Sequence, residues 1–203
     1  MKTEKQVTIF LLALLVTASV ATFFIVTKDK DSPDEYVYND FRVFKSPTVG
    51  YTIVAFVGEQ PYHLQLRNDP KNVTDIPIDS RIRNFILLKE GIIFTLDPNF
   101  NSIPVLGATE MANVFGRRLG IYDKKVTGAV TREPTNSTTP SGNLIANCKD
   151  VTTNTNVIKL QLGDTTEVYL EKNGCIIVQG TDEWEIIRAS DRLIYDVLEV
   201  IEN

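Results

Sequence analysis

The longest apolar segment of the chain lies close to its first residue. Residues 7–27 read VTIFLLALLVTASVATFFIVT, a run without a charged side chain. As a helix it would be about 31 Å long, which matches the roughly 30 Å hydrocarbon core of a bilayer. The run is apolar on every face, unlike a helix at a protein surface, which has one polar side. It predicts a transmembrane anchor that follows a short N-terminal segment, 1–6.

A cleaved secretory signal is the alternative interpretation of this segment. Its small residues at 19–21 resemble a cleavage site, and two lysines precede the apolar run. The apolar residues at 23–26 continue the run beyond that point. We therefore expect the segment to stay attached as a single-pass anchor, with the bilayer as its partner.

After a charged tether at 28–35, alternation and spacing predict strands and helices in mixed order. The Asn173-Gly174 pair predicts a tight hairpin turn. The best-defined helix runs from Asp182 to Ile201, with one apolar stripe. The predicted strands are 36–46 (or an extended arm), 51–58, 62–69, 92–98, 125–131, 157–162, 167–170 and 175–179. Two further helices are predicted: a short one that opens at 78–80, and a longer one over 105–119.

Two parts of the chain repeat a similar order of elements. EGIIFTLDP followed by ATEMANVFGRRLG parallels NGCIIVQGTDEWEIIRASDRLIYDVL, each a turn, an apolar strand and an amphipathic helix. With the preceding hairpins, this predicts an α+β fold of mostly antiparallel strands with helices on one face, arranged as two β-β-α units. A chance recurrence of elements is the alternative. The expected parts are a first half at 36–131, a Ser/Thr/Pro/Asn-rich linker at 132–150 and a second half at 151–203.

Equal numbers of lysines flank the apolar run, so the positive-inside rule does not orient it. Three other features favour an extracytoplasmic C-terminal part. The chain has two cysteines, Cys148 and Cys175, which are candidates for one disulfide, with a pair of buried thiols as the alternative. The linker has the composition of an exported segment. Sequons at Asn72 and Asn136 are glycosylation candidates, although such motifs also arise by chance.

The residues that usually carry catalysis or bind metals are scarce. His63 is the single histidine, and no HxxH, HxxE, CxxC or GxSxG motif accompanies it. Phosphate-binding glycine loops are also missing, and a net charge of −5 disfavours nucleic acid as a partner. The sequence predicts no catalytic residue, no cofactor and no metal site.

Some weaker candidates for a site have a structural explanation. Arg117-Arg118 and Lys124-Lys125 form one basic cluster, which is typical of a helix C-terminus and would otherwise contact anionic lipid or glycan. Trp184, the single tryptophan, is expected to pack on the sheet rather than to serve as a ligand platform. Four acids at strand ends or helix starts could serve a glycosidase or act as caps: Asp69, Asp97, Glu110 and Asp182.

Several segments together resemble a group of uncharacterised archaeal proteins. They are RNDPKNVTDIPID, the strand ending in LDP, the helix ending at 115–118, and CIIVQGTDEWEIIRASDRLIYDVLEVI. The similarity covers most of residues 51–201. It implies one N-terminal membrane helix with an exported domain, and it supports pairing of the two cysteines. It carries no known activity.

The sequence thus predicts a membrane-anchored extracytoplasmic protein without enzymatic activity, which contacts envelope proteins or glycans. A binding module for a small ligand or glycan, with its site between the two halves, is the first alternative. An envelope hydrolase that uses paired carboxylates is the second.

Overall fold

The computed structural model describes residues 34–46, 48, 50–117, 120–135 and 142–201. The predicted anchor at 7–27 lies outside these ranges. Within them, no helix is both long enough and apolar enough to cross a membrane. The chain divides into two units, Met1–Tyr36 and Val37–Asn203, and the fold below is that of the second.

A four-stranded sheet has the order β1-β2-β3-β4. The hairpin predicted at 51–69 is confirmed, because β3 and β4 pair antiparallel. The single strand predicted at 36–46 is instead divided, since Asn39 and Asp40 take left-handed backbone angles, with φ of 44° and 67°. Such a two-residue turn matches the twist of paired strands. The strands are β1 (Glu35–Tyr38), β2 (Phe41–Ser46), β3 (Gly50–Val57) and β4 (Gln60–Leu66).

A five-stranded sheet has the order β6-β5-β7-β9-β8. Here the expectation of mostly antiparallel strands is wrong, because β5 pairs parallel with β6 and β7, and β7 pairs parallel with β9. Between β5 and β6 the helix at 103–115 returns the chain to the same end of the sheet, and between β7 and β9 the antiparallel strand β8 does so. The strands are β5 (Gly91–Leu96), β6 (Lys125–Val130), β7 (Thr155–Leu162), β8 (Glu167–Leu170) and β9 (Ile176–Gly180).

The α+β class is confirmed, but the two β-β-α units are not formed as predicted. The repeated strand and helix are present as β5 with α3 (Ile103–Phe115) and β9 with α4 (Glu183–Val197), both strands in one sheet. The hairpin β8–β9, turned by Asn173-Gly174 with φ of +84° at the glycine, joins that sheet as expected. The hairpin β3–β4 belongs to the other sheet, so the first unit is split.

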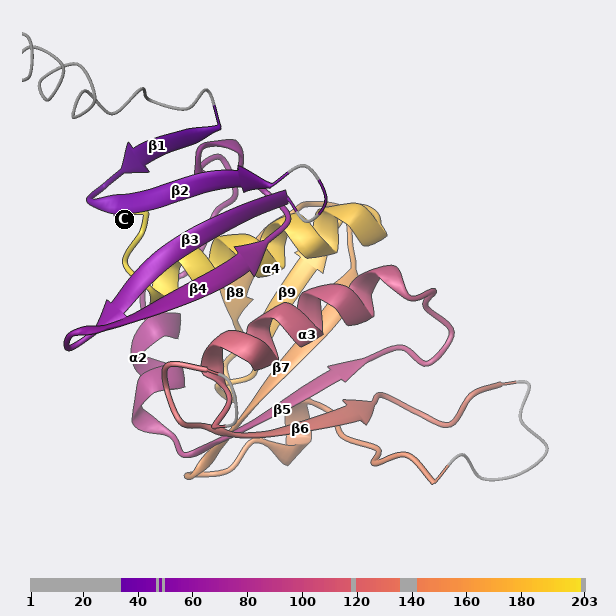
Figure 1. The fold of residues 1–203 in the computed structure, drawn as a ribbon. Helices are drawn as coiled ribbons and strands as arrows, with labels where there is room; N and C mark the ends of the chain where they lie inside the picture. Colours follow the sequence, from indigo (N-terminus) through magenta and orange to yellow (C-terminus); the bar gives the residue numbers. More distant parts are fainter. Residues whose placement is uncertain (1–33, 47, 49, 118–119, 136–141, 202–203) are drawn as a thin grey trace, which may run out of the picture. The chain divides into compact units, whose positions relative to one another are not determined.

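Helices α3 and α4 lie side by side between the two sheets (Figure 1). The apolar stripe predicted for the last helix is confirmed as core, from Ile186 to Val197. The polar side of α4 is buried as well, because the four-stranded sheet covers it. A short helix, α2 (Ile82–Leu88), packs against α4.

A disulfide ties down the C-terminal end of the segment 132–150 that was predicted to be a linker. The sulfur atoms of Cys148 and Cys175 lie 2.09 Å apart, as the pairing prediction requires. Cys148 opens the short 3-10 helix η2 (Cys148–Asp150), and both cysteines pack with Val157 and Ile177. Thr95 Oγ1 donates to the carbonyl of Ala146 at 2.7 Å. Residues 145–151 therefore cover part of the sheet.

Replacing both cysteines by serine should destabilise the fold. The crosslink spans a separation of 27 residues, and closing such a loop restricts the unfolded chain by about 3–4 kcal/mol. Chemical unfolding of the full chain in detergent measures this difference. The wild type should shift to the stability of the double variant after reduction, and equal stability of the oxidised wild type and the variant would contradict the prediction.

Candidate functional site

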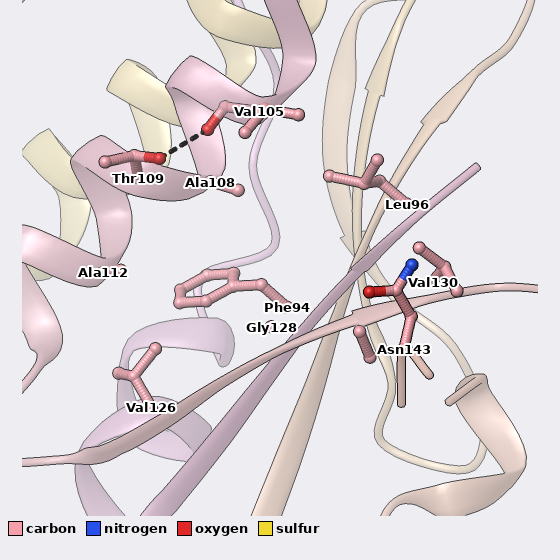
Figure 2. A pocket seen from close by; sticks show the side chains of 11 residues that line it. Phe94, Leu96, Val105, Ala108, Thr109, Ala112, Val126, Gly128, Val130 and Asn143 are labelled. Carbon is pink, nitrogen blue, oxygen red and sulfur yellow. Dashed lines mark hydrogen bonds between the residues drawn. The ribbon is translucent and has the colours of Figure 1, made fainter. Parts of the chain in front are cut away.

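A cavity of about 450 Å³ lies beneath helix α3, beside the edge of the five-stranded sheet (Figure 2). Phe94 points into it from β5, and Thr109 lines its helix side. The Thr109 hydroxyl donates to the carbonyl of Val105 at 2.8 Å, which leaves this wall without a free donor. The remaining walls are mainly aliphatic: Leu96, Val105, Ala108, Ala112, Val126, Gly128, Ala129, Val130 and Asn143.

The cavity exists because α3 sits closer to α4 than to the sheet edge. A Cβ atom at Gly107 would lie 2.6 Å from Ser190 Oγ, so the two helices approach each other closely at this point. The side chains that face β5 and β6 are small, with alanine at 108 and 112. The ligand cleft expected between the two halves is not present at the α3–α4 contact, and the cavity lies on the opposite side of α3.

Strand β6 is an edge strand, and its edge is partly unpaired. At one end, the N–H of Lys124 donates to the carbonyl of Phe115 at 2.9 Å. At the other end, the N–H of Val130 donates to the carbonyl of Leu144 at 2.8 Å. Alternation places the backbone groups of Val126 and Gly128 on the same outer side. In the described ranges these two residues have no outward hydrogen bond, although both line the cavity.

The rim of the cavity is apolar and accessible. Val105, which lines the cavity, is 44% exposed, and the two residues that follow the lining residue Asn143, Leu144 and Ile145, are 49% and 45% exposed. Isolated exposed aliphatic side chains are normal, but a group of them around an apolar cavity is typical of an interaction site. Sequence periodicity could not identify this site, because the group comes from two segments that lie far apart in the sequence.

A buried polar cluster lies on the other side of α3. Asp191 of α4 is fully buried and accepts from the backbone N–H and the Nδ2 of Asn68, both at 2.8 Å. Glu110 of α3 lies close enough to Asp191 for the two carboxyl groups to affect each other's pKa, and Glu110 Oε1 lies 2.9 Å from Arg67 Nε. Glu110 Oε2 and Asp191 Oδ1 have no other partner among the described atoms, so one proton between the carboxyl groups satisfies both.

Burial explains why this pair holds a proton. It raises the pKa of Glu110 to about 8, with the Asp191 charge adding to the effect and Arg67 opposing it. Burial also raises the pKa of Asp191 to about 6, against the lowering effect of the Asn68 hydrogen bonds. The two carboxyl groups are buried against each other and Arg67, whereas glycosidase carboxylates flank an open substrate groove about 5–9.5 Å apart. This geometry does not suit the two-carboxylate hydrolysis considered from the sequence.

The other three acids considered for hydrolysis stabilise local structure. Asp69 accepts from the N–H of Lys71 at the start of the 3-10 helix η1 (Pro70–Asn72). Asp182 caps α4 through the N–H of Glu185. Asp97 accepts from the N–H of Asn99 and pairs with Arg132 at 3.0 Å.

The remaining sequence candidates are spread over the surface. His63 lies on β4 opposite Val54, and Arg117 pairs with Asp123 at 2.9 Å. Lys124 donates to the carbonyls of Leu87 and Lys89 at 2.6 and 2.8 Å, so part of the basic cluster serves the fold. Within the described ranges, the single group of possible metal ligands is Cys148, Glu171 and Cys175, two of which lie at disulfide distance.

Two predictions concern accessibility. The sequon asparagine Asn72 is exposed in η1, whereas Asn136 lies outside the described residues. Trp184 was expected to pack on the sheet, and this prediction is wrong because its side chain is 58% exposed. The residue lies in the first turn of α4, before the helix enters the space between the sheets.

The buried acid pair should make stability fall as pH rises. In the fold, the pKa values of Glu110 and Asp191 lie above their ordinary values of 4.5 and 3.8. The protonated pair therefore stabilises the fold fully below about pH 4, and this stabilisation is lost as the pH rises past about 6 and then about 8. Between pH 6 and 9 the melting temperature should drop on the order of 5 °C. In Glu110→Gln the drop should be much smaller, and an equal drop in both proteins would count against the shared proton.

Comparisons with known proteins found no match: no protein-family model, no curated protein and no solved structure is similar to this chain.

Proposed function

We propose that this chain is a membrane-anchored, extracytoplasmic interaction protein without enzymatic activity, and that the edge of β6 binds an extended segment of an envelope protein. A single observation carries the proposal. The unpaired stretch of β6 at Val126 and Gly128 lies directly against the apolar cavity under α3.

Backbone pairing would supply the general part of this binding. An extended peptide can add a strand to an exposed sheet edge, with main-chain hydrogen bonds giving affinity and side-chain pockets giving specificity. The free stretch of β6 is short, because the segments around Gly116 and Ile145 pair with the two ends of the strand. A partner would therefore contribute a few residues of strand rather than a long one.

The cavity would supply the specific part. Every second side chain of an added strand points to the same face of the sheet. On the face that carries α3, these side chains would lie next to the cavity. Its volume of about 450 Å³ accommodates one or two large aliphatic or aromatic side chains. The exposed Val105, Leu144 and Ile145 would be covered at the same time. A free apolar small molecule would use the cavity but not the strand edge.

The membrane anchor and the external location rest on the sequence and on two features of the described part. Residues 7–27 have the length and composition of a spanning helix. The two cysteines lie at disulfide distance, and disulfides persist in oxidising compartments. The sequon at Asn72 is exposed. The similarity to archaeal single-pass proteins agrees with this location.

Fractionation tests the anchor. The full chain should remain in the membrane pellet after an alkaline carbonate wash, and a variant that lacks residues 7–27 should be released. External protease added to intact cells should digest the C-terminal part. Full-length protein in the supernatant, or protection from the protease, would contradict the proposed location.

Site-specific crosslinking in intact cells tests the binding edge. A small aliphatic diazirine side chain at Gly128 is tolerated, since a Cβ there has no neighbour within 4 Å, and it leaves most of the cavity open. It should give one reproducible crosslinked partner, whereas the same group at Glu59, on the hairpin between β3 and β4, should not.

Filling the cavity gives the matched test. Ala112→Phe should reduce the crosslink at Gly128 about tenfold, because the anchoring pocket of an interface dominates its affinity. Glu59→Phe adds the same side chain elsewhere and should leave the crosslink unchanged. Equal yields at positions 128 and 59, or an unchanged yield in Ala112→Phe with a normal melting temperature, would refute the proposed edge.

A further inference from the structure

A second cavity, of about 340 Å³, lies beside the first turns of α4 and is separate from the β6 edge. We call it the Trp184 groove. At Gly50, which lines the groove, the backbone of the neighbouring strand lies very close, because a Cβ atom there would be 2.6 Å from the carbonyl oxygen of Leu66. Its lining residues are Thr48, Gly50, Arg67, Asn68, Trp184, Ile187 and Arg188.

Trp184 gives this groove an exposed aromatic wall. Its indole is 58% exposed although the adjacent face of α4 is core, and Ile187 completes the apolar part of the lining. Leaving a large aromatic surface in water is unfavourable. The flat face of an indole ring is a good surface for the C–H groups of a sugar ring, and its edge carries one N–H donor.

The polar part of the lining is rich in donors. It consists of two guanidinium groups, one carboxamide and one hydroxyl, and no acidic residue belongs to the described lining. The Asn68 side chain uses its Nδ2 donor on Asp191. Guanidinium groups donate and never accept, and they pair with carboxylates in a bidentate manner. These walls therefore complement a ligand with acceptor groups.

Arg67 belongs to the groove and has a buried N–H group without a hydrogen bond in the described part of the fold. Its Nε lies 2.9 Å from Glu110 Oε1, yet the N–H does not point at that oxygen, and the buried Nε has no hydrogen bond within the described part. Because Glu110 and Asp191 share one proton, the two carboxyl groups beside Arg67 together carry a single negative charge near neutral pH.

Arg188 is held in place beside it. Its Nη1 contacts both carboxylate oxygens of Glu185 at 2.9 Å, and its Nη2 donates to the carbonyl of Asn72 at 2.6 Å and lies 3.1 Å from an oxygen of Asp75. Asp75 is largely exposed, and exposed ion pairs contribute little. A ligand carboxylate can compete with Asp75 for this guanidinium.

We propose that the Trp184 groove binds an acidic sugar residue, with its ring against Trp184 and its carboxylate on Arg67 and Arg188. The volume of the groove suits one or two sugar rings. The inference is independent of the strand edge of β6, and it assigns a ligand of a different chemical class to a different surface.

Intrinsic fluorescence tests the proposal directly, because Trp184 is the single tryptophan of the chain. The full chain in detergent micelles is titrated with a galacturonic acid trimer. The neutral glucose trimer maltotriose, sodium acetate and inorganic phosphate are titrated in parallel. The uronic acid trimer should change the emission in a saturable manner, and maltotriose, acetate and phosphate should require concentrations at least tenfold higher.

Variants assign the effect to the groove. Arg67→Gln should weaken binding of the uronic acid trimer about tenfold, since it removes a charge-assisted hydrogen bond. Glu110→Gln leaves Arg67 charged and should bind at least as tightly. Arg81→Gln, at an arginine outside the groove, should bind like the wild type. Calorimetry with Trp184→Ala, which has no fluorescence, should also show binding about tenfold weaker.

Several outcomes would overturn the proposal. They are no saturable change with the uronic acid trimer, equal binding of maltotriose, and equal binding of acetate or phosphate. An unchanged affinity in Arg67→Gln would overturn it too. None of these results would affect the crosslink expected at Gly128.

Discussion

The burial of α4 on all sides is the constraint on which the rest of the structure depends. The helix lies between two sheets, so its polar side chains cannot reach bulk water and must find partners in the fold. Asp191 receives two hydrogen bonds from Asn68, and the Tyr195 hydroxyl donates to the Asn68 carbonyl at 2.5 Å. Arg192 Nε reaches the carbonyl of Ile76 at 3.3 Å. These bonds fix the segment after β4 against the helix, and the four-stranded sheet is held over α4 by the same contacts.

This constraint also shapes both surfaces proposed for binding. Because Gly107 brings α3 close to Ser190 of α4, α3 covers the edge of the five-stranded sheet only loosely, and small side chains leave the cavity beside β6. At the other end, α4 emerges from the core at its first turn, so Trp184 and Arg188 line a groove next to Arg67. The Glu110–Asp191 proton links the two regions, since it joins α3 to α4 directly behind Arg67.

The two surfaces differ in chemistry, so the two proposed ligands belong to different classes. The β6 edge offers unpaired backbone groups and an apolar cavity, the combination that recognises extended peptide. The Trp184 groove offers an aromatic ring and guanidinium groups, which recognise acidic sugars. The disulfide-tethered residues 145–151 contribute the exposed Ile145 beside the first surface, and the same segment pairs with one end of β6 and so limits the open edge in the described part to Val126 and Gly128.

The sequence by itself determined what depends on neighbours within one element: the hairpin of β3 and β4, the Asn173-Gly174 turn, and the apolar stripe of α4 from Ile186 to Val197. It also identified both cysteines, although their pairing needed the structure to bring residues 148 and 175 together. Tertiary structure alone decided that β5, β7 and β9 run parallel, that Asp191 on the polar side of α4 is buried, and that Trp184 is exposed. The physical reason is that periodicity records which side of an element is apolar. The partner strand, the cover over a polar face and the small residues that leave a cavity are set by segments far away in the chain.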